Sequence, residues 1–175
     1  MKKIITVVII IVGLIFLSFK MNDNSMKKLE VGDKVPSFKL NDQNGNAFTV
    51  NSLIGKPMVI YFYPKDDTPG CVKEACKFRD DFEDFLKLET LVIGISADNV
   101  ESHKKFEEKY NLPFTLLADV KNEVRKLFGV SKSAMGMIPG RVTYIIDAEG
   151  VIQYIFDDMM HAEKHIAVAL DFLRG

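Results

Sequence analysis

The chain has 175 residues, of which 47% are apolar and 27% charged, and its formal net charge is −1. This composition is typical of a globular protein and excludes a disordered or fibrous one. The 23 basic residues form no long basic block, so nothing predicts a nucleic-acid partner, and two cysteines are too few for a disulfide scaffold or a Cys-rich zinc site.

The N-terminus predicts a membrane segment. An apolar run covers residues 4–19, between Lys2-Lys3 and Lys20, and no A-x-A-like cleavage pattern follows it. We therefore expect residues 1–25 to form one hydrophobic helix, an uncleaved single-pass anchor in the cell membrane, with the remaining chain on the extracytoplasmic side. Two alternatives remain: a cleaved signal peptide, or a translation start at Met26 that leaves a cytoplasmic protein.

Residues 26–175 read as a single domain, because they contain no repeat, no Pro/Ser-rich linker and no long charge run. Short segments rich in β-branched and aromatic residues predict seven strands. In chain order these are Ser37–Leu40, Ala47–Val50, Met58–Tyr63, Thr90–Ser96, Phe114–Leu117, Val142–Asp147 and Val151–Phe156.

Apolar residues spaced by three and four predict helices between these strands. They recur at Ala75, Phe78, Phe82, Phe85 and Leu86, then at Phe106 and Tyr110, and then at Val124, Leu127 and Phe128. A last helix is expected at His161–Leu173.

The order of these elements predicts an α/β protein with a mixed central sheet flanked by helices. Met58–Tyr63 and Thr90–Ser96 are nearly continuous apolar runs with one helix between them, as in central parallel strands. The last two strands are joined by only three residues, which is too short for a crossover, so they must be antiparallel. A strand–helix–strand unit followed by a hairpin and a terminal helix is the thioredoxin-like arrangement.

Both cysteines lie where a buried strand leads into a helix, the place where open α/β sheets bind ligands. Asp67 or Thr68 can cap that helix and Pro69 suits its first turn, which places Cys71 near the helix N-terminus. Unpaired backbone N–H groups and the helix dipole there favour a thiolate. The alternative is an inert, buried apolar cysteine.

The spacing of Cys71 and Cys76 favours a redox role over a structural one. Five residues along an ideal helix separate two Cα atoms by about 8.7 Å, whereas a disulfide needs less than about 7 Å. A bond between these sulfurs would require local unwinding, which suits a transient intermediate better than a permanent staple. The spacing is not C-x-x-C, which disfavours a thioredoxin-type disulfide reductase.

The segment Pro64-x-x-x-Thr68-x-x-Cys71 resembles the active-site signature of peroxiredoxins. The wider stretch YFYPKDDTPGC-x3-AC-x-FRD resembles the peroxiredoxin Q, or bacterioferritin comigratory protein, subgroup. The resemblance continues through Leu91–Ser96, Leu112–Asp119 and Arg141–Asp147, and so covers nearly all of the predicted domain.

This resemblance implies a thiol-dependent peroxidase that reduces hydrogen peroxide and organic hydroperoxides. By it, Cys71 is the peroxidatic cysteine and Cys76 the resolving cysteine, while Pro64, Thr68 and Arg141 complete the pocket. It implies a monomer that requires no metal, haem or flavin. Thioredoxin, or a membrane-tethered thioredoxin-like protein if the anchor is real, would reduce the Cys71–Cys76 disulfide.

Two other functions remain open at this point. The fold and the anchor would also suit an envelope thiol–disulfide oxidoreductase, which would reduce protein disulfides without consuming peroxide. A non-enzymatic module with a static disulfide is the third hypothesis. Arg141 alone would be interpreted as part of a surface salt bridge, and Thr68 and Pro64 as capping and turn residues.

The remaining polar residues are interpreted as structural. His161 and His165, four residues apart on the last helix, suggest a metal site, but no third ligand is identifiable, so a solvated helix face is expected. Asp66-Asp67 is interpreted as a solvated turn. Glu74, one turn after Cys71, is expected to pair with a basic neighbour and not to act as a base.

Overall fold

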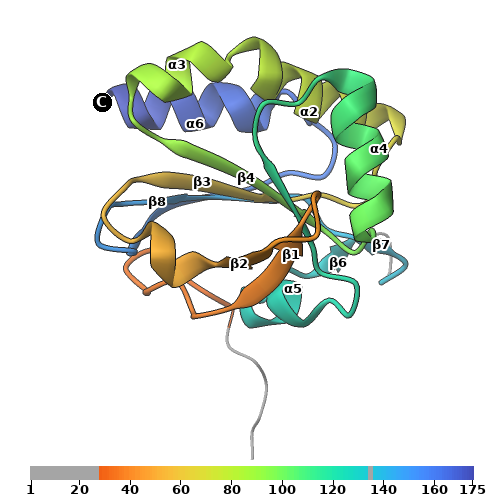
Figure 1. Ribbon diagram of the computed structural model, residues 1–175. Helices are drawn as coiled ribbons and strands as arrows, with labels where there is room; N and C mark the ends of the chain where they lie inside the picture. The colour runs from red at the N-terminus through yellow and green to blue at the C-terminus, as the bar shows by residue number, and fades with distance from the viewer. Residues whose placement is uncertain (1–27, 134–135) are drawn as a thin grey trace, which may run out of the picture.

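In the computed structural model, residues 28–133 and 136–175 are described, and they form one seven-stranded sheet, a two-stranded ribbon and several helices (Figure 1). The strands are β1 (Lys39–Asp42), β2 (Ala47–Thr49), β3 (Met58–Phe62), β4 (Leu91–Ser96), β5 (Thr115–Ala118), β6 (Lys132–Ser133), β7 (Ile138–Pro139), β8 (Val142–Ile146) and β9 (Ile152–Asp157). The helices are η1 (Val50–Leu53), α2 (Pro69–Asp80), α3 (Phe82–Lys87), α4 (Val100–Tyr110), α5 (Glu123–Leu127) and α6 (Lys164–Arg174).

The large sheet is mixed, with the strand order β2-β1-β5-β4-β3-β8-β9. Strands β3, β4 and β5 are parallel neighbours, while β8 pairs antiparallel with β3 and with β9. This arrangement confirms the thioredoxin-like fold and the mixed sheet that the sequence predicts. Since parallel strands end at the same edge, the loops after β3 and β4 lie close together there.

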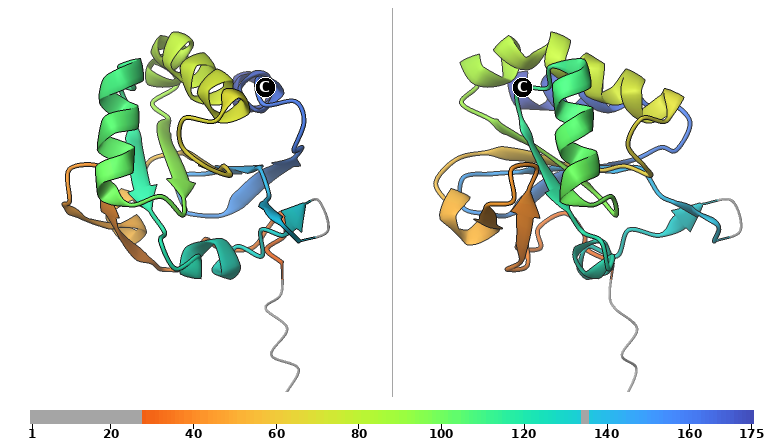
Figure 2. Two further views of the ribbon diagram at one scale, coloured as in Figure 1. Left: turned by 90° about the vertical axis from the view of Figure 1, so that its right-hand side faces the viewer. Right: turned by 45° about the vertical axis from the view of Figure 1, so that its right-hand side comes forward.

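Helices cover both faces of the sheet, as the apolar composition of the central strands requires (Figures 1 and 2). One core contains apolar residues of α2, α3, α4 and α6, including Phe78, Phe106 and Ile166. The other lies against η1 and α5 and includes Val50 and Phe128. In β4, Gly94 leaves space for the Tyr61 ring, since a Cβ atom at this position would lie 2.7 Å from the Tyr61 hydroxyl.

Several predicted boundaries shift, each for a local reason. The apolar pattern expected to be one helix is divided at Asp81 into α2 and α3, and Leu86 lies outside the core. Helix α6 begins at Lys164, three residues later than predicted, because the Asp158 carboxylate accepts bonds from the backbone N–H groups of Met160 and His161 and holds them in a turn. Val50 belongs to η1 instead of a strand.

The expected hydrophobic helix within residues 1–25 lies outside the described residues. Among the residues that the structure describes, no helix has both the length and the apolar character needed to cross a membrane.

Candidate active site

The loop between β3 and α2 places Cys71 in the first turn of α2. Thr68 occupies the N-cap position with an extended backbone, and Pro69 is the first helical residue. The Thr68 side chain does not cap the helix, contrary to one of the two predicted capping options. Its hydroxyl donates instead to the Lys65 carbonyl at 3.0 Å, which closes the loop on itself. Asp67, the other option, has a left-handed backbone with φ of 56°.

Arg141 lies directly against Cys71, although the two residues are 70 positions apart in the sequence. Its Nη2 is 3.5 Å from the Cys71 Sγ, and both residues are buried, with Cys71 only 2% exposed. The sheet explains this meeting, because β8 pairs antiparallel with β3 and brings Val142 opposite Phe62. The start of β8 therefore lies beside the end of β3, where the cysteine loop begins. Arg141 is thus a buried neighbour of Cys71 and not part of a surface salt bridge.

Glu74 binds the other arm of the same guanidinium. Arg141 Nη1 donates to Glu74 Oε2, and Glu74 is fully buried on α2, one turn after Cys71. This pair confirms the expectation that Glu74 has a basic partner. Burial raises the pKa of Glu74 to about 8, although Arg141 opposes the rise. Burial alone would lower the pKa of Arg141, but Glu74 and Cys71 raise it above its ordinary value.

The other predicted site residues lie on the loop before Cys71 and on the helix after it. Pro64 is half-buried at the start of the loop, and Thr68 is half-buried at its end, with its hydroxyl directed to Lys65. Cys76 is a half-buried free cysteine on the next turns of α2, and its interaction with Arg79 helps to raise the pKa of that arginine. The structure therefore brings Cys71 and Arg141 together and leaves Cys76 as a separate thiol.

A buried polar network that the sequence analysis missed holds the loop in place. Asp66 is 6% exposed, so the interpretation of Asp66 as part of a solvated turn is wrong. Its carboxylate lies 2.9 Å from His103 Nδ1 and accepts bonds from the hydroxyls of Tyr63, at 2.7 Å, and Ser102, at 2.8 Å. The second ring nitrogen of His103 donates to the Leu117 carbonyl, 3.1 Å away.

His103 therefore has a polar partner at each ring nitrogen. The Asp66–His103 contact connects the cysteine loop to α4, and the His103–Leu117 bond connects α4 to β5. The only sequence signal for it is the presence of His103 on a helix next to an apolar face, which did not distinguish it from a surface histidine.

Asp67 and Arg125 hold the same loop from two sides. The Asp67 carboxylate is exposed and accepts bonds from Lys109 Nζ and the Tyr110 hydroxyl at the end of α4, at 2.6 Å in each case. Buried Arg125 donates to the carbonyls of Tyr63 and Gly140, at 2.7 and 2.8 Å. These two carbonyls belong to the segments that carry Cys71 and Arg141, so Arg125 fixes their relative position.

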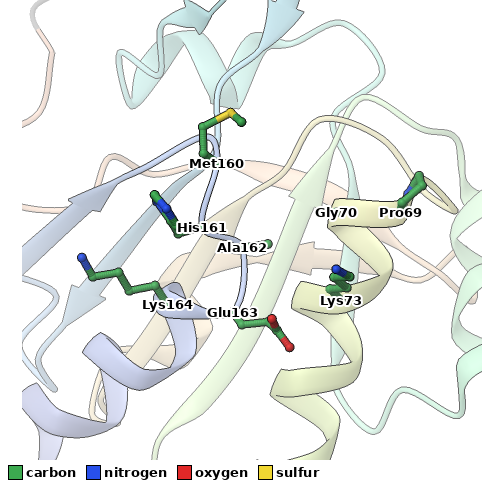
Figure 3. Close-up of a pocket in the computed structure, with 8 residues that line it drawn as sticks. All are labelled: Pro69, Gly70, Lys73, Met160, His161, Ala162, Glu163 and Lys164. Atoms are coloured by element: carbon green, nitrogen blue, oxygen red, sulfur yellow. The ribbon is translucent and has the colours of Figure 1, made fainter.

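A groove of about 420 Å³ lies beside the first turn of α2 (Figure 3). Pro69, Gly70 and Lys73 line one side, and the segment from Met160 to Lys164 lines the other.

The two histidines of that region differ in environment. His161 is exposed as expected, but His165 is fully buried, which contradicts the prediction of a solvated face for both. Burial lowers the pKa of His165 to about 4, so this ring is neutral near pH 7.

Comparison with known proteins supports the resemblance seen in the sequence. Residues 31–155 match the model of the AhpC/TSA family. The chain is 50% identical over 148 residues to the chloroplastic peroxiredoxin Q of Oryza sativa subsp. japonica and to that of Arabidopsis thaliana, which covers 85% of this chain and 68% of each relative.

Solved structures show the same similarity. Peroxidoxin BcpB from Mycobacterium tuberculosis superposes with a TM-score of 0.77 at 34% identity, covering 83% of this chain and 97% of the other. A peroxiredoxin Q structure from Xanthomonas campestris gives a TM-score of 0.73 at 30% identity and covers 78% of this chain and 89% of its own.

The relatives overturn one prediction. The similar peroxiredoxins Q are described as chloroplastic proteins, so the expectation of a protein anchored in the cell membrane with an extracytoplasmic domain is wrong.

Proposed function

The chain belongs to the AhpC/TSA family and is a peroxiredoxin, a thiol-dependent peroxidase, and on that premise we propose that Cys71 is the sulfur that attacks the hydroperoxide. One observation carries this assignment: the Arg141 guanidinium lies 3.5 Å from the Cys71 Sγ, in a buried site at a helix N-terminus. A permanent positive charge and the helix dipole both stabilise a thiolate there. The arginine beside Cys76, Arg79, lies on the same helix and pairs with Asp80.

The proposed first step is a nucleophilic substitution at oxygen. The Cys71 thiolate attacks the terminal oxygen of the hydroperoxide, an S–O bond forms and the O–O bond breaks. The sulfur is oxidised to a sulfenic acid, and the alkoxide or hydroxide that leaves takes up one proton to become an alcohol or water. Negative charge moves from sulfur to oxygen during this step, and Arg141 lies where it can stabilise that charge throughout.

Thr68 and Pro64 receive supporting roles in this proposal. The Thr68 hydroxyl lies one helical turn before Cys71, and a rotation of its side chain would exchange the Lys65 carbonyl for the substrate oxygen. Pro64 has no N–H group and packs at the start of the loop, so it would keep water from the sulfur without competing for its hydrogen bonds.

Cys76 is proposed as the resolving cysteine. Its thiol condenses with the Cys71 sulfenic acid, an S–S bond forms and water leaves. Both residues are free and lie within the continuous helix α2, five positions apart, so the helix must open locally before the sulfurs can meet. An external dithiol of the thioredoxin type then reduces the disulfide by exchange.

The proposed substrates are hydrogen peroxide and organic hydroperoxides. The peroxiredoxin from Xanthomonas campestris is described as having alkyl peroxide reduction activity, which supports the inclusion of organic substrates. Because both cysteines belong to one chain, the cycle needs no second subunit, and we propose that the catalytic unit is a monomer formed by residues 26–175.

The test compares the wild type with Cys71→Ser and Cys76→Ser, using thioredoxin and its reductase as the electron source. Cys71→Ser should abolish peroxide consumption. Cys76→Ser should consume one equivalent of peroxide and stop at the sulfenic acid, which mass spectrometry identifies after trapping with a dimedone-type reagent. Peroxide turnover by Cys71→Ser would contradict the assignment, and reduction of protein disulfides without peroxide consumption would favour a thiol–disulfide oxidoreductase instead.

A further inference from the structure

Two acidic groups share one buried cation at the proposed site. Arg141 uses Nη1 for Glu74 Oε2 and Nη2 for the Cys71 Sγ, and all three residues are buried. If Glu74 and Cys71 were both ionised, two negative charges would face a single guanidinium away from water. Such an arrangement is costly because like charges in a buried site oppose each other's ionisation.

The surroundings of the second carboxyl oxygen of Glu74 indicate that Glu74, and not Cys71, is the neutral group. Glu74 Oε1 is buried and has no hydrogen-bond partner among residues 28–133 and 136–175. His165 Nδ1 on α6 lies 3.9 Å from it, beyond hydrogen-bond distance. A buried carboxylate oxygen without a donor carries uncompensated negative charge, whereas burial of the neutral acid costs much less.

The tautomer of His165 strengthens this reading. His165 Nε2 lies 2.8 Å from the Asp158 carbonyl, which can only accept, so the ring proton is on Nε2. Nδ1 is therefore an acceptor, and it takes the hydroxyl proton of Thr143 at 2.7 Å. The nitrogen that faces Glu74 thus has no proton to donate to a carboxylate, and the low pKa of His165 keeps it that way near neutral pH.

The remaining neighbours give Glu74 no further positive charge. Tyr61 on β3 is buried close to both Glu74 and Cys71, its hydroxyl has no partner among the described residues, and burial together with these two groups raises its pKa. From α2, β3, β8 and α6, the titratable or charged groups that face Glu74 are therefore Cys71, Tyr61, Arg141 and His165. Arg141 is the only cation in this set. Burial accordingly raises the pKa of Glu74 to about 8.

We propose that Glu74 holds a proton whenever Cys71 is a thiolate, so that the two acidic groups share one negative charge over Arg141. Activation of the thiol then moves one proton within the trio: the S–H bond of Cys71 breaks, an O–H bond forms on Glu74, and the net charge stays at zero. Glu74 is a positioning residue in this scheme, because as a neutral acid it holds Arg141 in place without neutralising it. The inference rests on the proposed role of Cys71.

The first test needs no change near the sulfur. Infrared difference spectra of the reduced protein across neutral to alkaline pH should show the C=O band of one protonated carboxylic acid. That band should be missing in Glu74→Gln and unchanged in the control Glu83→Gln, whose side chain is exposed on α3. In Cys71→Ser the band should titrate at lower pH, because the anionic neighbour is gone. Absence of the band in the wild type, or the same midpoint in Cys71→Ser, would overturn the proposal.

The second test follows the thiolate. Ultraviolet absorbance of the Cys71 thiolate, measured in a Cys76→Ser background, should titrate as a coupled pair in the presence of Glu74 and as a single group after Glu74→Gln. The rate constant of Cys71 with peroxide should fall at alkaline pH in the wild type, as Glu74 ionises and competes for Arg141, and should stay flat in Glu74→Gln. Identical profiles for the two proteins would refute the shared charge, whereas peroxide turnover by Cys71→Ser would refute the proposed function itself.

Discussion

Arg141 binds two neighbouring side chains at once, which requires the two terminal nitrogens of a guanidinium. Its two terminal nitrogens point at different residues, Glu74 and Cys71. Lysine has the same charge on a single nitrogen and cannot reach both groups with the same geometry. The identity of this residue therefore matters beyond its charge.

The substitution Arg141→Lys should lower the rate constant of Cys71 with peroxide by about 10²–10³-fold, the usual effect of removing one preorganised donor from a charged transition state. Stopped-flow oxidation of the reduced protein measures it. Arg174→Lys, at the exposed end of α6, is the matched control and should react at the wild-type rate. A reaction of Arg141→Lys within a few fold of wild type would show that charge alone suffices.

Glu74 and His165 should give the stability of the fold opposite dependences on pH. The folded pKa of His165 is about 4, below its ordinary 6.5, so its contribution is present above pH 6.5 and is lost as the pH falls to about 4. The folded pKa of Glu74 is about 8, above its ordinary 4.5, so its contribution is present below pH 4.5 and is lost as the pH rises to about 8.

In Glu74→Gln, the pH dependence of stability should therefore show the contribution of His165 without the opposing contribution of Glu74. Its free energy of unfolding should rise by about 3 kcal/mol between pH 4 and pH 6.5, and the difference from the wild type should keep growing up to about pH 8. Urea denaturation at a series of pH values measures both quantities. A constant difference between the two proteins over this range would show that Glu74 has the same pKa in the folded and unfolded chains.

At the scale of single residues, the sequence analysis named Cys71 and Arg141, which the structure brings into contact, but it missed the polar network around them. Cys71 and Arg141 belong to a recognisable signature, and their contact agrees with it. Asp66 and His103 lie 37 positions apart, and nothing in the local sequence shows that β3 and β4 bring them together. A short polar run is also ambiguous, since Asp66 is buried while its neighbour Asp67 is exposed.

Helix α2 has to be both ordered and breakable in the proposed cycle. It carries Cys71 in its first turn and Cys76 near its middle, while Lys77 pairs with Asp81 across its C-terminal end at 2.9 Å. An exposed ion pair of this kind contributes less than about 1 kcal/mol, so it does little to oppose opening.

Oxidation with one equivalent of peroxide should therefore reduce the helical signal in circular dichroism and increase amide hydrogen exchange within Pro69–Asp80. The same treatment of Cys76→Ser should leave both unchanged, because no disulfide forms. Full retention of amide protection in the oxidised wild type would exclude a Cys71–Cys76 bond, since the intact helix holds their Cα atoms about 8.7 Å apart.

Sequence periodicity predicted the elements well where burial is uniform and less well at their ends. The five residues of β3 and of β8 are all buried, and both strands lie where alternating and continuous apolar patterns place them. The break at Asp81 and the late start of α6 depend on individual hydrogen bonds, such as those to the Asp158 carboxylate. An apolar pattern contains no information about such bonds.

At the scale of the whole molecule, the His103–Asp66 pair joins segments that lie far apart in the sequence. It links the cysteine loop to α4 and, through the Leu117 carbonyl, to β5. Removal of His103 takes away two buried hydrogen bonds and leaves a cavity beside Asp66.

The substitution His103→Ala should therefore lower the free energy of unfolding by about 2–5 kcal/mol. His161→Ala, at an exposed site, is the control and should change it by less than about 1 kcal/mol. Denaturant titration of the reduced proteins provides the comparison. A loss as small as that of the control would mean that the buried pair contributes no more than a surface contact.

The overall topology followed from a few global features of the sequence: two continuous apolar strands with a helix between them, and a final pair of strands with a short connection. These features predict that β3 and β4 are parallel and that β8 and β9 are antiparallel, but not that β8 lies beside β3. The position of Arg125, which bonds the Tyr63 and Gly140 carbonyls, depends instead on distances that only the folded chain defines.

Tyr110 has a consequence that extends beyond its own helix. Its hydroxyl donates to Asp67 in the cysteine loop at 2.6 Å, while its backbone carbonyl accepts a bond from Arg79 of α2 at 2.8 Å. If α2 opens as far as Arg79 to release Cys76, the bond from Arg79 to that carbonyl breaks, and α2 loses a contact with α4. The oxidised protein would thus expose a surface that is covered in the reduced protein. A reductant could then recognise the disulfide form by this surface before it attacks the disulfide.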